Sequence, residues 1–147
     1  MANEIYQAGV FIRETLGASA ALTALVGTRI YPEFAPQNAT YPLVVFALLS
    51  SPDRNAVGHN RRIFTEPLFV VRGVANETSW VTVSLIADAI DAALMGANNN
   101  GVLSPALHVQ GAYREAPLRY TEVPQGTSGT RYNHSGGQYR LFVHTNA

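Results

Sequence analysis

The stretch Asn76–Met95, NETSWVTVSLIADAIDAALM, is expected to decide how the rest of the chain folds. Its apolar residues recur every three or four positions, at Trp80, Val83, Ala87, Ile90 and Leu94. This spacing lines one face of a helix, which Asn76 can cap and Gly96 can end. Residues 81–83 are β-branched and would also suit a strand, but the length, the cap and the alanine-rich second half favour a helix. Such a helix is ~30 Å long and could cover a small sheet.

The polar side of this helix is narrow. It holds only Glu77, Ser84, Asp88 and Asp91. Val81, Leu85 and Ala92 lie just beyond these residues, on the side away from Trp80. A surface helix usually keeps a broader polar face. Two interpretations are open: the helix lies deep in its own domain, or these three residues form a second apolar strip that meets another subunit.

The composition is that of one domain, over residues 1–147, that has neither cysteine nor lysine. The absence of cysteine excludes disulfides and thiolate chemistry, and the absence of lysine excludes a Walker-type phosphate loop and a Schiff base. Ten arginines balance ten acidic residues, which argues against a dedicated nucleic-acid or membrane-surface binder. The start of the chain lacks the basic region of a signal peptide, and no apolar run is long enough to span a membrane, so we expect no membrane association.

The other elements are predicted from capping residues, prolines and alternation. Along the chain they are helices at 3–16 and 19–26, a proline-stiffened connector at 29–41, strands at 43–49, 61–74, 107–114 and 139–144, and loops at 50–60, 97–105 and 115–137. This order, α-α-β-β-α-β-β, predicts an α+β fold in which an antiparallel sheet of two β-hairpins packs against a central helix, with N-terminal helices before it.

Three segments raise questions about burial, strand pairing and order. Strand 43–49 (LVVFALL) is apolar on both faces, so both must be covered, and we expect neighbouring protomers to help. Pro67 within strand 61–74 indicates a bulge or an edge position. Loop 115–137 is long and rich in glycine and proline, which is typical of functional or disordered segments.

No residues form a recognisable catalytic or metal-binding motif. If Tyr113 paired with Tyr139 in the last hairpin, His108 would lie opposite His144, but a zinc site needs three or four protein ligands. A structural or solvated role for these histidines is therefore favoured. The sequence predicts no catalytic residue, no cofactor and no metal.

Two groups of charged residues could carry function. Asp88 and Asp91 lie one turn apart and could mimic a catalytic pair, although such residues more often form a solvated helix face. Arg54, Arg61 and Arg62 flank loop 50–60. With a net charge of zero, partner carboxylates are favoured over phosphates as their targets.

Three blocks near the N-terminus carry a family resemblance: LVGTRIYP at 25–32, APQ at 35–37 and YPLVVF at 41–46. Together they resemble the signature of phage tail terminator proteins, also called tail completion or tail-to-head joining proteins. A short helix ended by Gly27, a proline-stiffened connector and a two-sided strand give this pattern a physical rationale. The last strand, opening GGQYR at 136–140, is similar too, so the resemblance spans most of residues 20–144.

The resemblance implies a structural virion protein without enzymatic activity. It would form a homo-oligomeric ring, a hexamer, that caps the tail tube and joins it to the neck or head-completion protein. DNA would pass through the ring without sequence-specific binding. The location would be the tail–neck junction of the virion, after assembly in the host cytoplasm.

Two alternatives stay open: another ring-forming neck protein of adaptor or head-closure type, and a small enzyme or ligand-binding domain unrelated to phage. On the tail terminator interpretation, the apolar strip should dominate subunit contacts, and arginines should pair with acidic residues of a neighbour. The residues expected at subunit or tube interfaces are Arg54, Arg61, Arg62, Val81, Leu85, Glu115, Glu122 and Arg131.

Overall fold

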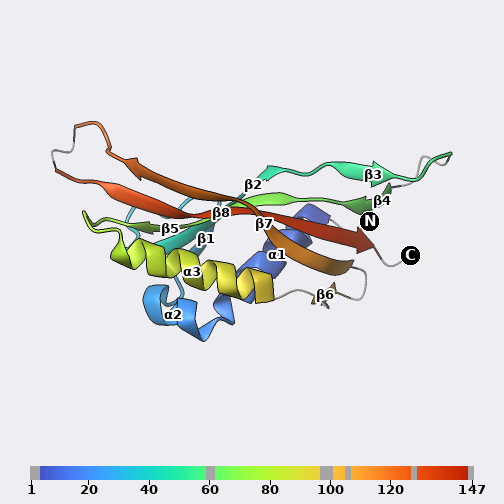
Figure 1. Cartoon of the computed structure of the whole chain (residues 1–147), viewed down its shortest axis with the longest axis horizontal. Helices are drawn as coiled ribbons and strands as arrows, with labels where there is room; N and C mark the ends of the chain where they lie inside the picture. Colours follow the sequence, from blue (N-terminus) through green and yellow to red (C-terminus); the bar gives the residue numbers. More distant parts are fainter. Residues whose placement is uncertain (1–3, 59–61, 97–100, 105–106, 127–128, 146–147) are drawn as a thin grey trace.

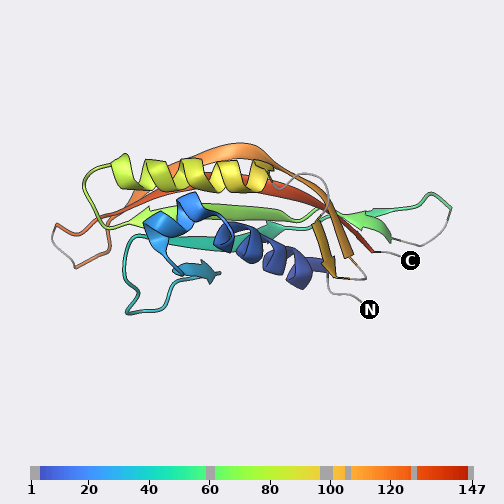
Figure 2. The same ribbon diagram turned by 90° about the horizontal axis from the view of Figure 1, so that it is seen from below.

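The chain forms a long mixed sheet with helices on one of its faces (Figures 1 and 2). The computed structural model describes residues 4–58, 62–96, 101–104, 107–126 and 129–145. The helices in these ranges are α1 (Glu4–Gly17), α2 (Ala20–Val26) and α3 (Val81–Gly96). The strands are β1 (Ile30–Pro32), β2 (Leu43–Ser50), β3 (Asp53–Asn55), β4 (Arg62–Thr65), β5 (Leu68–Ala75), β6 (Gly101–Ser104), β7 (Leu107–Glu122) and β8 (Tyr132–Thr145).

The sheet is organised around β8, which pairs with β5 and β4 along one edge and with β7 along the other. β2 and β1 continue beyond β5, β3 lies beside β4, and β6 pairs with β7. β2 and β5, which are connected through β3 and β4, pair antiparallel before α3 in the chain, and β7 and β8 form an antiparallel hairpin after it, so the predicted α+β fold is confirmed. β1 runs parallel to β2, which makes the sheet mixed. β1 lies within the predicted connector 29–41, and β3 and β6 lie within the predicted loops 50–60 and 97–105.

The three helices bury their apolar sides against the same face of the sheet. α3 lies over β8, β5 and β7, while α1 contacts β1 and also packs on α3 (Figure 2). Ser19 caps α2 by accepting a hydrogen bond from the Leu22 N–H at 3.3 Å, and Gly27 ends it with φ 62°, as predicted. No single helix in the described ranges is long and apolar enough to cross a membrane; α1 and α2 have that composition only together, and they are bent by 84°.

The central helix begins later than predicted. The helix starts at Val81. The backbone N–H of Val81 donates to the Ser79 hydroxyl at 3.2 Å, so Asn76 is not the cap. Residues 76–80 instead carry the chain from the end of β5 up to the helix. The side-chain amide of Asn133 on β8 holds this turn by donating to the carbonyls of Glu77 and Ser79, at 2.8 and 3.2 Å. The buried residues of α3 are Val83, Ile86, Ala89, Ile90 and Leu94, with Trp80 and Ala87 half-buried.

Both faces of β2 are covered by the chain itself. Val44 and Phe46 belong to the main core beneath the helices. Leu43 and Val45 point to the other face, where the connector between β1 and β2 and the start of β8 cover them with Ala35, Ala39, Tyr41 and Tyr132. The prediction of two-sided burial is confirmed for residues 43–46, but no neighbouring protomer is needed to provide it.

Pro67 divides the predicted strand 61–74 into β4 and β5. Proline has no N–H to donate to a ladder, so the pairing is interrupted there. Its carbonyl still accepts from the Leu141 N–H at 2.9 Å, and Arg140 Nη1 donates to the Glu66 carbonyl at the same distance. Glu66 and Pro67, at the interruption, are therefore still hydrogen-bonded to β8.

The predicted loop 115–137 is wrong over most of its length. β7 continues to Glu122 and β8 begins at Tyr132, so only 123–131 connect them. Gly126 and Gly129 do lie in this connection, with positive φ, whereas Gly136 serves packing: a Cβ there would lie 2.0 Å from the Val71 carbonyl oxygen. The β7–β8 hairpin extends to one end of the molecule and the β3–β4 hairpin to the other (Figure 1).

Bulges in β7 change the predicted alternation. The register shifts between Val109 and Gly111, so Ala112 is buried while Tyr113 turns to the opposite face and stacks on Phe142 at 5.8 Å. Tyr113 consequently pairs with Arg140 and not with Tyr139. His108 does lie opposite His144 in the ladder.

Gly73 allows α3 to approach the sheet closely, and this contact is testable. A Cβ at Gly73 would lie 2.4 Å from Ile86 Cγ2, so we expect Gly73→Ala to lower the free energy of unfolding by about 1–3 kcal/mol through overpacking. In an Ile86→Ala background the same substitution should cost much less, because the clashing methyl group is gone. Urea unfolding of the four proteins measures this coupling. Gly17→Ala, where an added Cβ has no neighbour within 4 Å, is the control; an equal cost in both backgrounds would contradict the contact.

Candidate subunit interface

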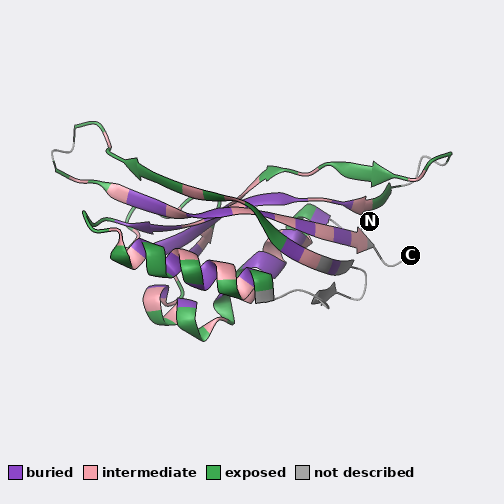
Figure 3. Cartoon of the chain, in the orientation of Figure 1, coloured by how far each residue is buried: buried purple, intermediate pink, exposed green. Residues whose placement is uncertain are grey.

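The outer face of α3 carries an exposed apolar strip. Val81 is 67% exposed and Leu85 51% exposed, and Ala92 is exposed as well. Helical periodicity places them opposite Val83 and Ile90, which are fully buried. Figure 3 shows exposed residues along the side of α3 that faces away from the sheet. The interpretation that the helix lies deep in its own domain is therefore wrong for this side. We call Val81, Leu85 and Ala92 the α3 strip.

Asp88 and Asp91 have different surroundings and do not form a carboxylate pair. Asp88 is exposed beside the α3 strip and has no partner among the described residues. Asp91 accepts a hydrogen bond from the Tyr139 hydroxyl at 2.9 Å and lies 3.9 Å from Arg114. Burial, and then the bond to Asp91, raises the pKa of Tyr139 far above its usual value. Asp91 thus attaches α3 to the sheet.

Most of the predicted charged interface residues have partners within the chain. Arg54 pairs with Glu66 at 3.0 Å, and Arg62 pairs with Glu4 of α1. Glu115 receives two hydrogen bonds from Arg140, at 3.0 and 3.1 Å, and these raise the pKa of Arg140. These bonds fasten the hairpins to the rest of the fold.

The two remaining arginines of the predicted set differ. Arg61 lies outside the described residues. Arg131 is exposed where the β7–β8 connection enters β8, and it has no partner in the part of the chain that the structure describes. The tips of both hairpins also expose apolar side chains, with Val57 fully exposed and Val123 61% exposed.

A polar cluster around His134, which sequence reasoning missed, lies on the face of the sheet away from the helices. His134 is only 5% exposed and stacks on Tyr120 with ring centroids 4.3 Å apart. Arg72 Nε donates to its Nδ1 at 3.2 Å, so Nε2 carries the proton and donates to Glu122 at 3.0 Å. The ring is therefore neutral. The signal was hidden because Tyr120 and His134 both fell in the predicted loop.

The described residues contain no group of three His, Asp or Glu side chains that could hold a metal ion. The structure instead presents three kinds of surface: the α3 strip, the two projecting hairpins and the sheet face away from the helices, which the connector between β1 and β2 covers only in part. Such surfaces suit binding to other protein subunits.

The fold and the sequence both match known proteins. One chain of a solved structure, the virion of a native gene transfer agent particle, matches with a TM-score of 0.63 and 22% identity, over 90% of this chain and 91% of that chain. The sequence matches the family described as tail completion protein gp17 over residues 11–144, so the chain belongs to this family of phage tail completion proteins. No curated protein matches significantly. The resemblance seen in the sequence is confirmed, and the protein is a structural component of the virion.

The buried neutral His134 predicts a pH dependence of stability. Burial, and then the charge of Arg72, lowers its pKa below the usual 6.5, although Glu122 acts in the opposite direction. Below pH 6.5 the folded state therefore binds fewer protons at His134 than the unfolded state does. The contribution of the neutral His134 to the free energy of unfolding is fully present above that pH, and it is lost as the pH falls through the lowered pKa.

We expect the unfolding free energy to fall more steeply between about pH 7 and pH 5 in the wild type than in His134→Gln. Urea unfolding at several pH values measures both slopes. Identical slopes in the two proteins would contradict a neutral, protonation-resistant His134.

Proposed function

We propose that this protein forms a closed ring, a hexamer, that caps the phage tail tube and joins the tail to the neck. Membership of the tail completion family supports a place at the end of the tail. The single observation that carries the ring is the α3 strip, an apolar surface that the chain leaves uncovered.

The α3 strip is proposed to dominate assembly for energetic reasons. Apolar surface contributes about 25 cal/mol for each Å² removed from water, whereas an exposed ion pair contributes about 1 kcal/mol or less. Arg54, Arg62, Glu115 and Glu122 are already paired within the chain, so a further pairing with a neighbour adds less than it would at an unpaired charge. We therefore assign these residues mainly to holding the hairpins in shape at the interface.

The hairpins are proposed to contact the tail tube or a neighbouring protomer through their tips. Arg131 and the exposed Val123 lie at one tip, and Val57 lies at the other. DNA is proposed to pass through the ring without being read, because a net charge of zero gives no strong attraction for phosphates. The role is structural and not enzymatic, as the family suggests.

Leu85→Asp is expected to abolish the ring. It places a charge in the middle of the α3 strip, which an apolar interface cannot solvate. Ser84→Asp is the matched control, since it adds the same charge one position away on the same helix but outside the strip, and it should assemble like the wild type. Native mass spectrometry, and electron microscopy of tail tubes mixed with each protein, give the readout. If Leu85→Asp caps tubes as well as the wild type, the α3 strip does not face a neighbour.

A further inference from the structure

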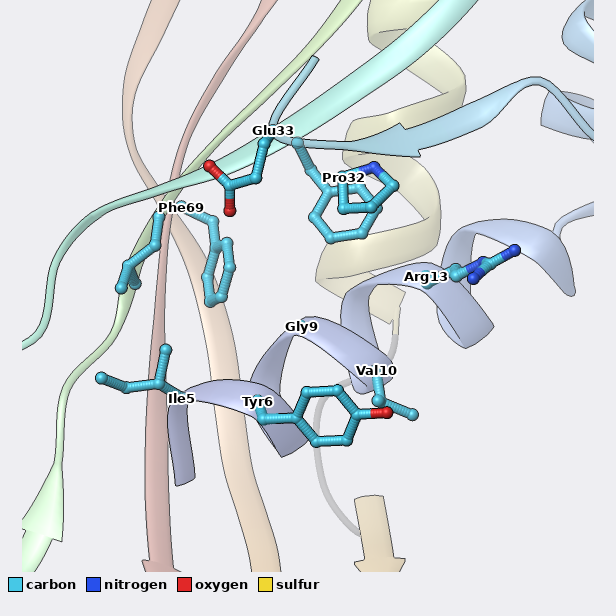
Figure 4. A pocket seen from close by; sticks show the side chains of 10 residues that line it. Ile5, Tyr6, Gly9, Val10, Arg13, Pro32, Glu33 and Phe69 are labelled. Carbon is cyan, nitrogen blue, oxygen red and sulfur yellow. The ribbon is translucent and has the colours of Figure 1, made fainter. Parts of the chain in front are cut away.

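An apolar groove runs between α1 and the edge of the sheet formed by β1 and β2 (Figure 4). Its cavity has a volume of about 280 Å³, and its walls include Ile5, Tyr6, Val10, Pro32 and Leu48. Arg13 of α1 lines it as well. Arg13 is exposed and has no partner among the described residues. We call this the α1 groove.

The α1 groove and the α3 strip lie at different sides of the molecule. In the sheet, β1 stands at one edge, and the strands follow as β2, β5, β8 and β7. α1 contacts β1 and also β8, β6 and β7, but the groove lies on its β1 and β2 side, whereas α3 lies over β5, β8 and β7 (Figure 2). One chain therefore presents a ridge on one side and a recess on another.

We propose that the α1 groove receives the α3 strip of a second copy of this chain. The two surfaces are both mainly apolar, and each carries a charge that can pair with the other, Asp88 beside the strip and Arg13 in the groove. Asp88 continues the α3 strip one turn after Leu85, and Arg13 lies along the groove. Neither charge has an internal partner, so their pairing between copies breaks no existing bond.

The spacing of the two helices selects a parallel arrangement. Asp88 follows Val81 by seven positions, and Arg13 follows Tyr6 by seven, which is about 10 Å along each helix. With Asp88 beside Arg13, a parallel helix brings Val81 to Tyr6 and Leu85 to Gly9 and Val10. Gly9 has no side chain, which leaves room for Leu85. An antiparallel helix would carry Leu85 to Leu16, beyond the part of α1 that lines the groove, and Val81 past the C-terminal end of α1.

The remaining charge of the groove agrees with this direction. Glu33 lies apart from Arg13, toward Ile5 and Phe69 (Figure 4). In the parallel arrangement Glu33 is near the N-terminal end of the docked α3, where the helix dipole is positive. α3 itself contains no basic residue that Arg13 would repel.

The contact is heterologous, because the α3 strip of one copy enters the α1 groove on a different side of the next copy. Each added copy leaves one strip and one groove free, and the series ends only when the last copy closes on the first. This inference rests on the proposed ring and names the two surfaces that build it.

Charge reversal, with a mixture that restores the pairing, tests the proposed contact between Asp88 and Arg13. Asp88→Arg alone and Arg13→Asp alone each place like charges in every contact, so each variant should assemble at least about tenfold less well than the wild type. A 1:1 mixture should assemble, because copies that alternate around the ring restore an opposite-charge pair at every contact. Native mass spectrometry should then show equal numbers of both variants in each ring. Both residues are exposed, so thermal unfolding should be unchanged.

A second experiment uses the absence of cysteine from the chain. A mixture of Val10→Cys and Leu85→Cys proteins, treated with a short bis-maleimide during assembly, should give a cross-linked dimer of the two variants. Val57→Cys in place of Leu85→Cys is the control and should link at least about tenfold less, because the hairpin tip is outside the α1 groove.

The outcomes separate the inference from the function. If wild-type protein forms no ring on tubes, the proposed function fails. If rings form but the single charge reversals assemble like the wild type, or the mixture does not recover, the groove is not the partner of the α3 strip and the inference is overturned while the ring stands.

Discussion

The close seating of α3 on the sheet is the contact on which the other surfaces depend. Ile86 packs over Gly73, where a Cβ would not fit, and the Tyr139 hydroxyl binds Asp91 one turn and a half further along the helix. Both contacts fix the rotation of α3 about its own axis. Once Val83 and Ile90 face the sheet, helical periodicity leaves Val81 and Leu85 no position except toward solvent. The exposed strip is therefore a consequence of the core, and a helix rotated to bury it would lose the bond from Tyr139.

Sequence reasoning found the elements whose signals are local. The cap at Ser19, the stop at Gly27 and the two-sided strand β2 follow from backbone preferences and apolar runs that a short window contains. It placed the start of α3 too early, because Asn76 has the chemistry of a cap while the turn is set by Asn133, far along the chain. Pro67 was correctly taken as a disturbance, but only the pairing with β8 shows that it separates two strands.

The β7–β8 hairpin could not be predicted because its stability comes from partners distant in sequence. Residues 115–122 and 132–137 are polar or glycine-rich, which in isolation favours a loop. In the fold they pair with each other, and β8 pairs with β5 as well, so residues 133–137 have strand partners on both sides whatever their side chains. The same applies to the bulge that turns Tyr113 outward, since register depends on both strands. Of the candidate site, the strip on α3 was predictable from periodicity, while the α1 groove needed the placement of β1.

Arginine supplies all the basic side chains of this chain other than histidine, since the chain has no lysine. Most described arginines act as forked donors inside the fold: Arg29 binds the Pro42 carbonyl, Arg140 spans Glu115 and Glu66, and Arg119 lies over the ring of Trp80 at 3.9 Å. Internal use of this kind removes a charge from the set available to other subunits. Among the described arginines, Arg13 and Arg131 are left without a partner. Arg13 lines the apolar α1 groove, and Arg131 lies at the end of the projecting β7–β8 hairpin. The arginines without an internal partner are therefore found where apolar surface is also exposed. A surface that joins uncovered apolar groups to one unpaired charge can give both affinity and register, which assembly of identical subunits requires.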